Sequence, residues 1–389
     1  MENFVFLNPT KVIFGKDTEL QVGKEVKAYS SKILLHYGSG SVIKSGLLNK
    51  VKESLKNEGV SFIELGGVKP NPRVSLVREG IKICRENNIS FILAVGGGSV
   101  IDSSKAISVG VPYNGDVWDF YDYKTQPKES LKVASVLTIP AAGSETSQSS
   151  VITNEELKLK RGLTNDLLFP VFTIMDPVLT FTLPQYQTAC GASDIMAHIM
   201  ERYFTNTKNV ELTDRLCEAA LKTIMHNAPL AIKDPSNYDA RAEIMFTGTV
   251  AHNNLLGMGR VEDWGSHSIE HEISAIYDVA HGAGLSVVFP AWIKYVYKTN
   301  PDRFLQFASR VFGIDVNYYN KEQTILDAVA CLEKFYKSIG LPTRLSDMNI
   351  TDKDLQEMAQ KATFDNKNTV GNFVKLTAKD VLEILKLAL

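Results

Sequence analysis

The sequence predicts an α/β domain over residues 1–184 followed by an all-helical domain over residues 185–389. In the first half, short β-rich apolar runs alternate with segments of helical periodicity, which is typical of a parallel sheet with helices on its faces. After Leu183 and Pro184, long helical patterns replace this alternation. A length of 389 residues is sufficient for two domains, each with its own core.

The elements of the first half follow one another in strand–helix order. The predicted strands are 33–37, 62–65, 91–95, 133–138 and 171–175. Apolar side chains recur at helical spacing in 42–56 and 74–87, which are therefore predicted helices. The run 91–95 is wholly apolar, as expected of a parallel strand buried on both faces. Ahead of these units, 4–6 and 11–15 are expected to form an edge hairpin. In the second half, the longest helical patterns are 212–225 and 326–338.

Composition excludes several classes of function. The net charge of -2 does not favour binding to nucleic acid or to an anionic membrane, so the substrate is expected to be a small molecule. The four cysteines form no CxxC pair and are expected to be reduced thiols. The sequence has no leader-like N-terminus and no apolar run of the roughly 18 residues that a membrane helix needs. Together these features predict a cytoplasmic protein.

A glycine-rich segment, 96–102, directly follows the third predicted strand and opens a helix. Glycines there let a phosphate approach the backbone, and free N–H groups at the helix N-terminus attract it. The candidate dinucleotide contacts in this segment are Gly97, Gly98, Ser99 and Asp102. The G-x-G-x-x-G fingerprint is absent, and the alternative is an ordinary turn in which Ser99 caps the helix and Asp102 serves its dipole.

A second loop, 37–41, follows the first strand and holds small residues and hydroxyls but no carboxylate. A carboxylate would bind the 2′-hydroxyl of NAD and repel the 2′-phosphate of NADP. Because it is missing and Lys44 lies one turn away, contact with the adenosine ribose would favour NADP(H) over NAD(H). The candidate contacts are Gly38, Ser39 and Ser41; the alternative is a solvent-exposed turn.

A third segment, 138–147, also follows a strand and carries small and hydroxyl-bearing residues that suit a phosphate or an amide. Lys160 lies downstream among several charges. On the sequence alone, we expect its side chain to be a solvated surface lysine.

Histidines and one aspartate are concentrated in the second half. Asp194 and His198 are four residues apart, as are His267 and His271, so a helix would place each pair on one face. His281 follows from the next turn or helix. Imidazole and carboxylate together are the ligands that divalent transition metals prefer. Each histidine alone has a hydrogen-bonded structural role as its alternative, but the set together predicts a metal site.

With these residues considered together, the chain resembles the iron-dependent (group III) alcohol dehydrogenases, within them the NADPH-dependent butanol dehydrogenase and aldehyde reductase branch. The resemblance covers essentially the whole chain, including the glycine loop and the histidine segments. It also rests on the motifs 8–10, 14–16, 69–72, 138–145, 176–177, 182–184 and 341–345. It implies a dehydroquinate synthase-like fold, with a Rossmann-like dinucleotide-binding domain before an all-α metal-binding domain.

The resemblance also assigns site residues. The implied metal ligands are Asp194, His198, His267 and His281. The implied dinucleotide contacts are Gly97, Gly98 and Ser99 at the pyrophosphate, Asn71, Thr138, Ser147 and Lys160 near the nicotinamide, Leu179 at an apolar wall, and Gly38, Ser39 and Ser41 at the 2′-phosphate. Two positions depart from the family pattern: Ser39 replaces a common glycine, and Thr146 replaces a methionine or valine, which puts contacts near the nicotinamide in question.

The implied activity is metal-dependent hydride transfer between NADP(H) and a primary alcohol or aldehyde such as butanal. Four protein ligands would close a tetrahedral zinc site, whereas Fe²⁺ keeps a position for substrate, so Fe²⁺ is expected and Zn²⁺ is the alternative. His271 is the expected catalytic proton relay; its alternative is orienting a ligand or a water. Asp263 is expected to be a helix N-terminal acid, or else to hold the second nitrogen of a ligand.

Other functions compete with this one. A lyase or cyclase of the dehydroquinate synthase type would use the same scaffold, but it should bring Lys and Arg to the ligand segments, and 191–198 and 266–284 contain neither. A metal-dependent hydrolase would not need the glycine and hydroxyl loops after strands, and a non-catalytic metal protein would not need a dinucleotide. A homodimer is expected, with the N-terminal hairpin extending a sheet between subunits.

Overall fold

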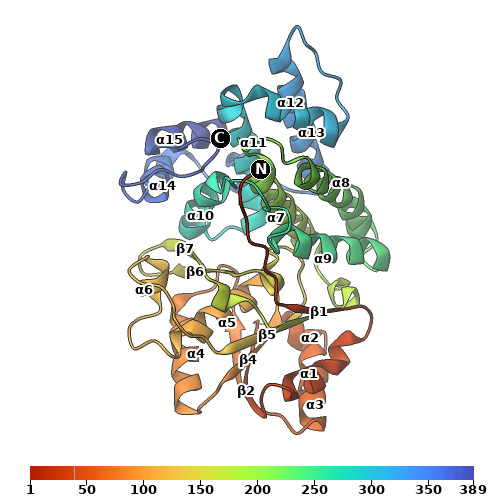
Figure 1. Cartoon of the computed structure of the whole chain (residues 1–389), viewed down its shortest axis with the longest axis vertical. Coiled ribbons are helices and arrows are strands. Elements are labelled where there is room, and N and C mark those ends of the chain that lie inside the picture. The colour runs from red at the N-terminus through yellow and green to blue at the C-terminus, as the bar shows by residue number, and fades with distance from the viewer. Residues whose placement is uncertain (39) are drawn as a thin grey trace. The chain divides into compact units, whose positions relative to one another are not determined.

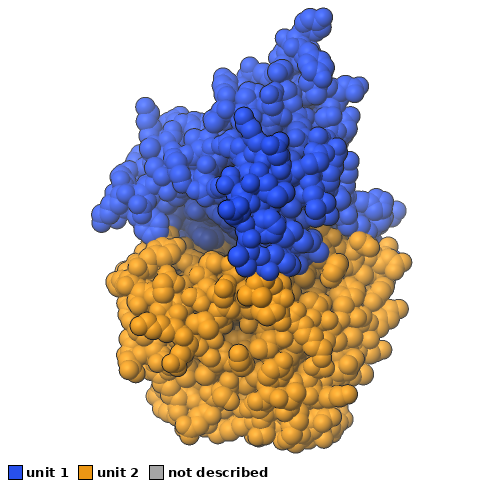
Figure 2. Space-filling model, viewed as in Figure 1, with its two compact units in different colours: residues 1–6, 184–234, 250–389 blue, residues 7–183, 235–249 orange. Residues whose placement is uncertain are grey.

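A computed structural model describes residues 1–38 and 40–389, so the predicted cofactor contact Ser39 lies outside the described residues. Contacts within the chain divide it into two compact units (Figure 2). Unit 1 is Met1–Phe6, Pro184–Asp234 and Val250–Leu389; unit 2 is Leu7–Leu183 and Pro235–Thr249. The predicted ranges 1–184 and 185–389 differ from these units mainly in two short segments, 1–6 and 235–249.

Unit 2 contains a six-stranded, fully parallel sheet with the order β1-β8-β5-β4-β2-β3 (Figure 1). Its strands are β1 (Lys11–Phe14), β2 (Lys32–Gly38), β3 (Ser61–Val68), β4 (Phe91–Gly96), β5 (Lys132–Leu137) and β8 (Phe172–Met175). Every residue of β4 is buried, as its apolar run predicts. The α/β class predicted for this half is therefore confirmed.

Helices cover both faces of the sheet. They are α1 (Val22–Lys27), α2 (Ser41–Lys44), α3 (Leu47–Asn57), α4 (Val74–Glu86), α5 (Gly98–Gly110) and α6 (Trp118–Tyr121), with short 3-10 turns η1 (Thr18–Gln21), η2 (Ser144–Thr146), η3 (Asp166–Leu168) and η4 (Pro177–Thr180). Because strand side chains alternate, Leu34 packs in the core under α4 and α5, whereas Ile33 and Leu35 pack in the core under α1 and α3. Each such buried side chain contributes about 1.5–3 kcal/mol relative to exposure.

Two predictions for this half are wrong in detail, and one hairpin was not predicted. The N-terminal hairpin does not form: 4–6 is not a strand, the backbone N–H of Glu2 bonds to Gly259 within unit 1, and β1 pairs in parallel with β8. The helix predicted at 42–56 breaks into α2 and α3 because Gly46 adopts a left-handed φ of 78°. A two-stranded antiparallel hairpin, β6 (Ser149–Asn154) and β7 (Leu159–Thr164), was not predicted; β6 begins with two serines, and β7 carries Lys160 and Arg161.

Unit 1 is built from helices, as predicted for the second half. The helices after β8 are α7 (Gln185–Tyr203), α8 (Glu211–Lys233), α9 (Tyr238–His252, mostly in unit 2), α10 (Gly265–Tyr277), α11 (His281–Val296), α12 (Pro301–Phe312), α13 (Lys321–Ser338), α14 (Leu355–Ala362) and α15 (Ala378–Leu387), with 3-10 turns η5 (Tyr297–Thr299), η6 (Ser346–Met348) and η7 (Asp352–Asp354). Helix α7 packs against α8 and α11 and is buried at every position from Thr188 to Tyr203. Across the described residues, no helix combines the length and apolarity needed to cross a membrane.

Candidate functional site

Three helices of unit 1 bring the predicted metal ligands together. Helix α7 carries Asp194 and His198 one turn apart, α10 carries His267, and His281 is the first residue of α11. Asp194 Oδ1 lies 3.6 Å from His198 Nδ1, 3.9 Å from His267 Nε2 and 3.8 Å from His281 Nε2. Suitable ligand atoms of Asp194, His267 and His281 all lie within 4.8 Å of one another. The rings of His198 and His267 are stacked, with centroids 4.8 Å apart.

The polar atoms at this cluster are buried and unsatisfied. Within 1–38 and 40–389, Asp194 Oδ1, His198 Nδ1 and His267 Nε2 have no hydrogen-bond partner. An unpaired buried polar atom costs about 1–3 kcal/mol, so several around one point fit an ion that accepts their lone pairs. Burial, with the added influence of His252 and His267, lowers the pKa of His198 well below its usual value. The neutral imidazole that results is the form that binds metals.

Two glutamates, neither predicted, hold the outer nitrogens of these imidazoles. Glu201 Oε1 lies 2.8 Å from His267 Nδ1, and Glu270 accepts from Nδ1 of His281. Each contact places the proton on Nδ1 and leaves Nε2 directed toward Asp194. A sequence signal for Glu201 existed, because it lies three residues after His198 on the same helix face.

Asp263 does not hold a ligand nitrogen. Its carboxylate accepts backbone N–H groups from Gly265 at 3.1 Å and from Asn372 and Phe373 at 2.7 Å each. The role as an acid at the start of α10 is therefore the one it adopts, and the alternative role as a partner of a ligand is wrong.

Two further histidines lie next to the cluster. His271 is partly exposed on α10, and its ring centroid is 5.5 Å from that of His281. His252, at the end of α9, was not predicted; its ring centroid is 4.4 Å from that of His198. No spacing relates His252 to the other histidines, because α9 meets them only in the folded chain.

The predicted dinucleotide loops lie in unit 2 at the carboxyl ends of neighbouring strands. Chain order reverses between β2, whose next strand is β3, and β4, whose next strand is β5. Ligands of parallel α/β sheets bind at such a switch point. Gly38 ends β2 and Ser41 begins α2, while Gly97 precedes α5, whose first residues are Gly98 and Ser99. Ser99 is therefore not the N-cap.

The loop after β4 packs closely against the loop after β5. A Cβ atom on Gly97 would meet the Ile139 side chain at 3.0 Å, and one on Gly98 would meet Ala142 at 2.9 Å. The Thr138 N–H donates to the Gly96 carbonyl at 3.0 Å. Glycine is thus required here by the packing of the two loops, and this requirement also keeps the start of α5 open.

The remaining predicted cofactor contacts are buried to different degrees. Lys160, on β7, is only 4% exposed, so the expectation of a surface lysine is wrong: the hairpin folds it inward. Ser147 and Asn71 are buried, and Asn71 has a left-handed φ of 53° in the loop after β3. Leu179, in η4, packs against the core. The Asp102 carboxylate accepts from Ser144 Oγ and from the Val151 N–H.

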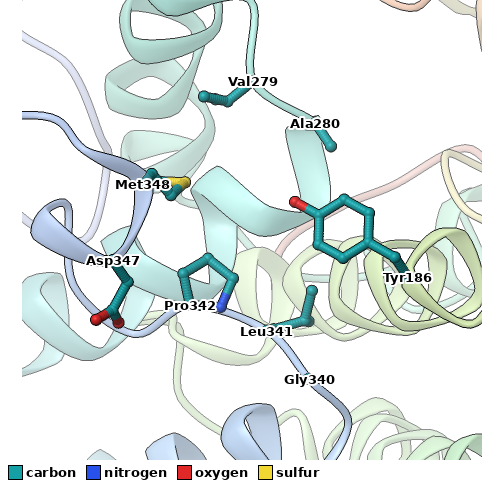
Figure 3. A pocket seen from close by; sticks show the side chains of 8 residues that line it. All are labelled: Tyr186, Val279, Ala280, Gly340, Leu341, Pro342, Asp347 and Met348. Carbon is teal, nitrogen blue, oxygen red and sulfur yellow. The ribbon is translucent and has the colours of Figure 1, made fainter.

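An open hollow of about 510 Å³ in unit 1 lies next to the start of α11 (Figure 3). It is lined by Tyr186, Val279, Ala280, Gly340, Leu341, Pro342, Asp347 and Met348. The Asp347 carboxylate accepts the backbone N–H groups of Thr343 and Arg344 at 3.0 Å each. None of the predicted ligands is among these described lining residues, and Ala280 directly precedes His281 at the start of α11.

Comparison with known proteins gives one family across both units. Residues 9–177 match the iron-containing alcohol dehydrogenase model, and 188–389 match the C-terminal model of the Fe-containing alcohol dehydrogenase family. The chain is 46% identical to a probable NADH-dependent butanol dehydrogenase of Bacillus subtilis over the full length of both. It is 34% identical to an NADPH-dependent aldehyde reductase of Escherichia coli, over 93% of each chain. The crystal structure of an NADH-dependent butanol dehydrogenase from Thermotoga maritima matches with a TM-score of 0.97 and 40% identity, covering 100% of this chain and 99% of that one.

Proposed function

The chain belongs to the iron-containing alcohol dehydrogenases, and from this premise we propose that it transfers hydride between NADP(H) and a primary alcohol or aldehyde at an Fe²⁺ site. That it is an alcohol or aldehyde oxidoreductase follows from the family. The metal, the cofactor preference and the residue roles are the substance of the proposal.

The cluster of buried, unpaired atoms around Asp194 Oδ1 carries the proposal. Asp194, His198, His267 and His281 would hold a divalent ion, and Fe²⁺ is preferred over Zn²⁺ because it accepts further ligands beyond four. When bound, such an ion supplies Lewis acidity at the substrate oxygen, and a reduced nicotinamide supplies the hydride.

Side chains of the protein orient the metal-binding imidazoles and exchange protons with the substrate oxygen. Glu201 and Glu270 fix the rings of His267 and His281 through Nδ1. His271 is the proposed proton relay: it is next to His281, and its partial exposure gives it a path to solvent that the buried His198 and His267 lack. An imidazole at this place can deliver a proton to the product alcohol oxygen, or remove one in the reverse direction.

The segment around the end of β2 and the start of α2 favours NADP(H) over NAD(H). Residues 37–46 contain no carboxylate, and Lys44 is exposed in α2. A 2′-phosphate is therefore tolerated, and its charge is complemented. The relative from Bacillus subtilis is described as NADH-dependent and the one from Escherichia coli as NADPH-dependent. The contribution of the loop to cofactor preference therefore has to be tested directly.

Substitution Ser39→Asp tests the loop. The added charge should weaken NADPH binding about tenfold or more and shift preference toward NADH. The measurement is kcat/KM for both cofactors. Ser61→Asp, at the exposed amino end of β3 and thus at the opposite edge of the sheet, is the matched control. An unchanged cofactor ratio in Ser39→Asp would show that the ribose binds elsewhere.

The substrate is proposed to be uncharged. The ligand segments 191–198 and 266–284 contain no lysine or arginine to hold a phosphate or carboxylate, which disfavours the lyase or cyclase alternative. Oxidation of NADPH with butanal by chelator-stripped protein, with and without added Fe²⁺ or Zn²⁺, tests the whole proposal. Metal-dependent turnover supports it; retained metal and dinucleotide binding without turnover would favour the alternative chemistry.

We also propose a homodimer. The expected hairpin is absent, but β1 is an edge strand that pairs only with β8 among the described residues and exposes Val12 and Phe14. Such an edge favours pairing with a second copy. Light scattering on Val12→Lys against wild type should show a loss of dimer; a wild-type monomer would contradict the proposal.

A further inference from the structure

Helix α5 carries a buried cation that the proposed mechanism does not use. Lys105 is 0% exposed, and its Nζ donates to three backbone carbonyls in one segment. These are the carbonyls of Ser144 at 2.7 Å, Ser147 at 2.8 Å and Ser149 at 2.8 Å. A lysine ammonium has three donors on one atom, which matches this set of acceptors.

Asp102, one turn earlier on α5, bonds to the same region. Its Oδ1 accepts from Ser144 Oγ at 2.5 Å, its Oδ2 accepts from the Val151 N–H at 3.0 Å, and its backbone carbonyl accepts from Ser150 Oγ at 2.8 Å. The segment 144–149 consists of the turn η2 and extended residues leading into β6, so only its last residue lies in a strand. The side chains of α5 therefore bond to the segment near both of its ends, while Asn8, Thr249 and the backbone of Asn165 bond to the residues between.

We propose that Lys105 is a positioning residue that holds segment 144–149 in place for the nicotinamide half of the cofactor. The inference rests on the proposed function, in which the N-terminus of the same helix binds the pyrophosphate and Ser147 lies near the nicotinamide. Helix α5 then sets both halves of the dinucleotide from one rigid element. An alkyl side chain at 105 would remove the donor that joins these three carbonyls and loosen the segment.

A positioning role of Lys105 should affect binding of the nicotinamide half of the cofactor but not binding of the pyrophosphate half. The pyrophosphate loop at Gly97 and Gly98 follows β4 and opens α5, and the ammonium of Lys105 donates to 144–149 rather than to this loop. Loss of Lys105 should therefore affect ligands that contain nicotinamide and leave ligands that lack it nearly unchanged.

The experiment compares Lys105→Met with wild type. NADPH binding is followed by its fluorescence, and binding of 2′-phospho-ADP-ribose, which has no nicotinamide, is followed by calorimetry. We expect at least tenfold weaker NADPH binding, an affinity for 2′-phospho-ADP-ribose within twofold of wild type, and a larger fall in kcat than any change in KM for butanal. Ser104→Ala is the matched control, because among the described residues its hydroxyl donates only to the Val100 carbonyl within α5.

A second variant guards against misfolding of the first. Ser144→Ala removes the hydroxyl that donates to Asp102, a smaller change than loss of the ammonium, and it should weaken NADPH binding a few-fold with the same selectivity. Equal losses for both ligands, or no loss, in folded variants would overturn the inference while leaving the proposed function standing. Wild-type protein that binds neither ligand would instead overturn the proposed function.

Discussion

Both units bury charged or titratable side chains, but they differ in whether the polar atoms are paired. In unit 1, Asp194 Oδ1 and His267 Nε2 lie near one point without a hydrogen-bond partner in the described part of the chain. In unit 2, the ammonium of Lys105 and the carboxylate of Asp102 are bonded to the backbone and hydroxyls of one segment. The first arrangement is the one we propose to hold a bound ion, whereas the second is satisfied by hydrogen bonds within the chain.

A buried polar group is costly unless it is hydrogen-bonded, so folding either pairs it or leaves it for a bound ion. Removing a group of the unpaired cluster should mainly change metal binding. Removing one of the paired set should mainly change local order and stability.

The largest effect is expected from His267→Ala. It removes one of the atoms that face Asp194, so metal retention and activity should be lost together. Metal content after dialysis and turnover with NADPH and butanal measure both. His226→Ala, at an exposed histidine of α8, is the control. Full activity of His267→Ala after chelator treatment would contradict the metal assignment.

A smaller effect is expected from Glu201→Gln. The amide keeps the shape of the side chain but weakens the contact with Nδ1 of His267, so metal affinity should fall roughly 10–100-fold while the fold is retained. Competition with a chelator measures the affinity without reference to turnover. Glu211→Gln, at an exposed position of α8, is the control. Equal affinity in both variants would mean that the tautomer is fixed by other contacts.

The smallest expected effect is on the pH dependence of stability, and it comes from the buried, hydrogen-bonded ammonium of Lys105. Burial lowers the pKa of Lys105 from 10.5 to about 8, although Asp102 and Glu145 favour its charged form. Above about pH 8 the unfolded chain therefore binds more protons at Lys105 than the folded chain does. The free energy of unfolding that Lys105 contributes consequently rises with pH until the lysine of the unfolded chain also loses its proton.

The measurement is urea unfolding of wild type and Lys105→Met at about pH 7 and about pH 9. The free energy of unfolding of wild type should rise relative to the variant by at most about 1.4 kcal/mol per pH unit. Lys82→Met, at an exposed lysine of α4, should show no such change. A pH-independent difference for Lys105→Met would show that the lysine titrates alike in both states.

Much of this molecule could be predicted from local patterns. The apolar run of β4, the helical spacing in α4 and the pairs at 194/198 and 267/271 each depend on residues close in sequence. What was missed depends on distant contacts: the burial of Lys160 by the hairpin, the approach of His252 to His198, and the glutamate partners of the imidazoles. The false N-terminal hairpin has the same cause, because β1 finds its partner in β8.

Helix α9 has a consequence for the order of events during synthesis. Its residues up to Thr249 belong to unit 2, where Met245 lies in the core, Phe246 meets Phe14, and Thr249 Oγ1 donates to Glu145 at 2.7 Å. A nascent chain that has passed Leu183 therefore still lacks part of the core of its first unit. The ribosome must add some 60 more residues, including α7 and α8, before the core of unit 2 is complete. Release of a chain shortened at that point should yield a species prone to aggregate rather than a free nucleotide-binding module.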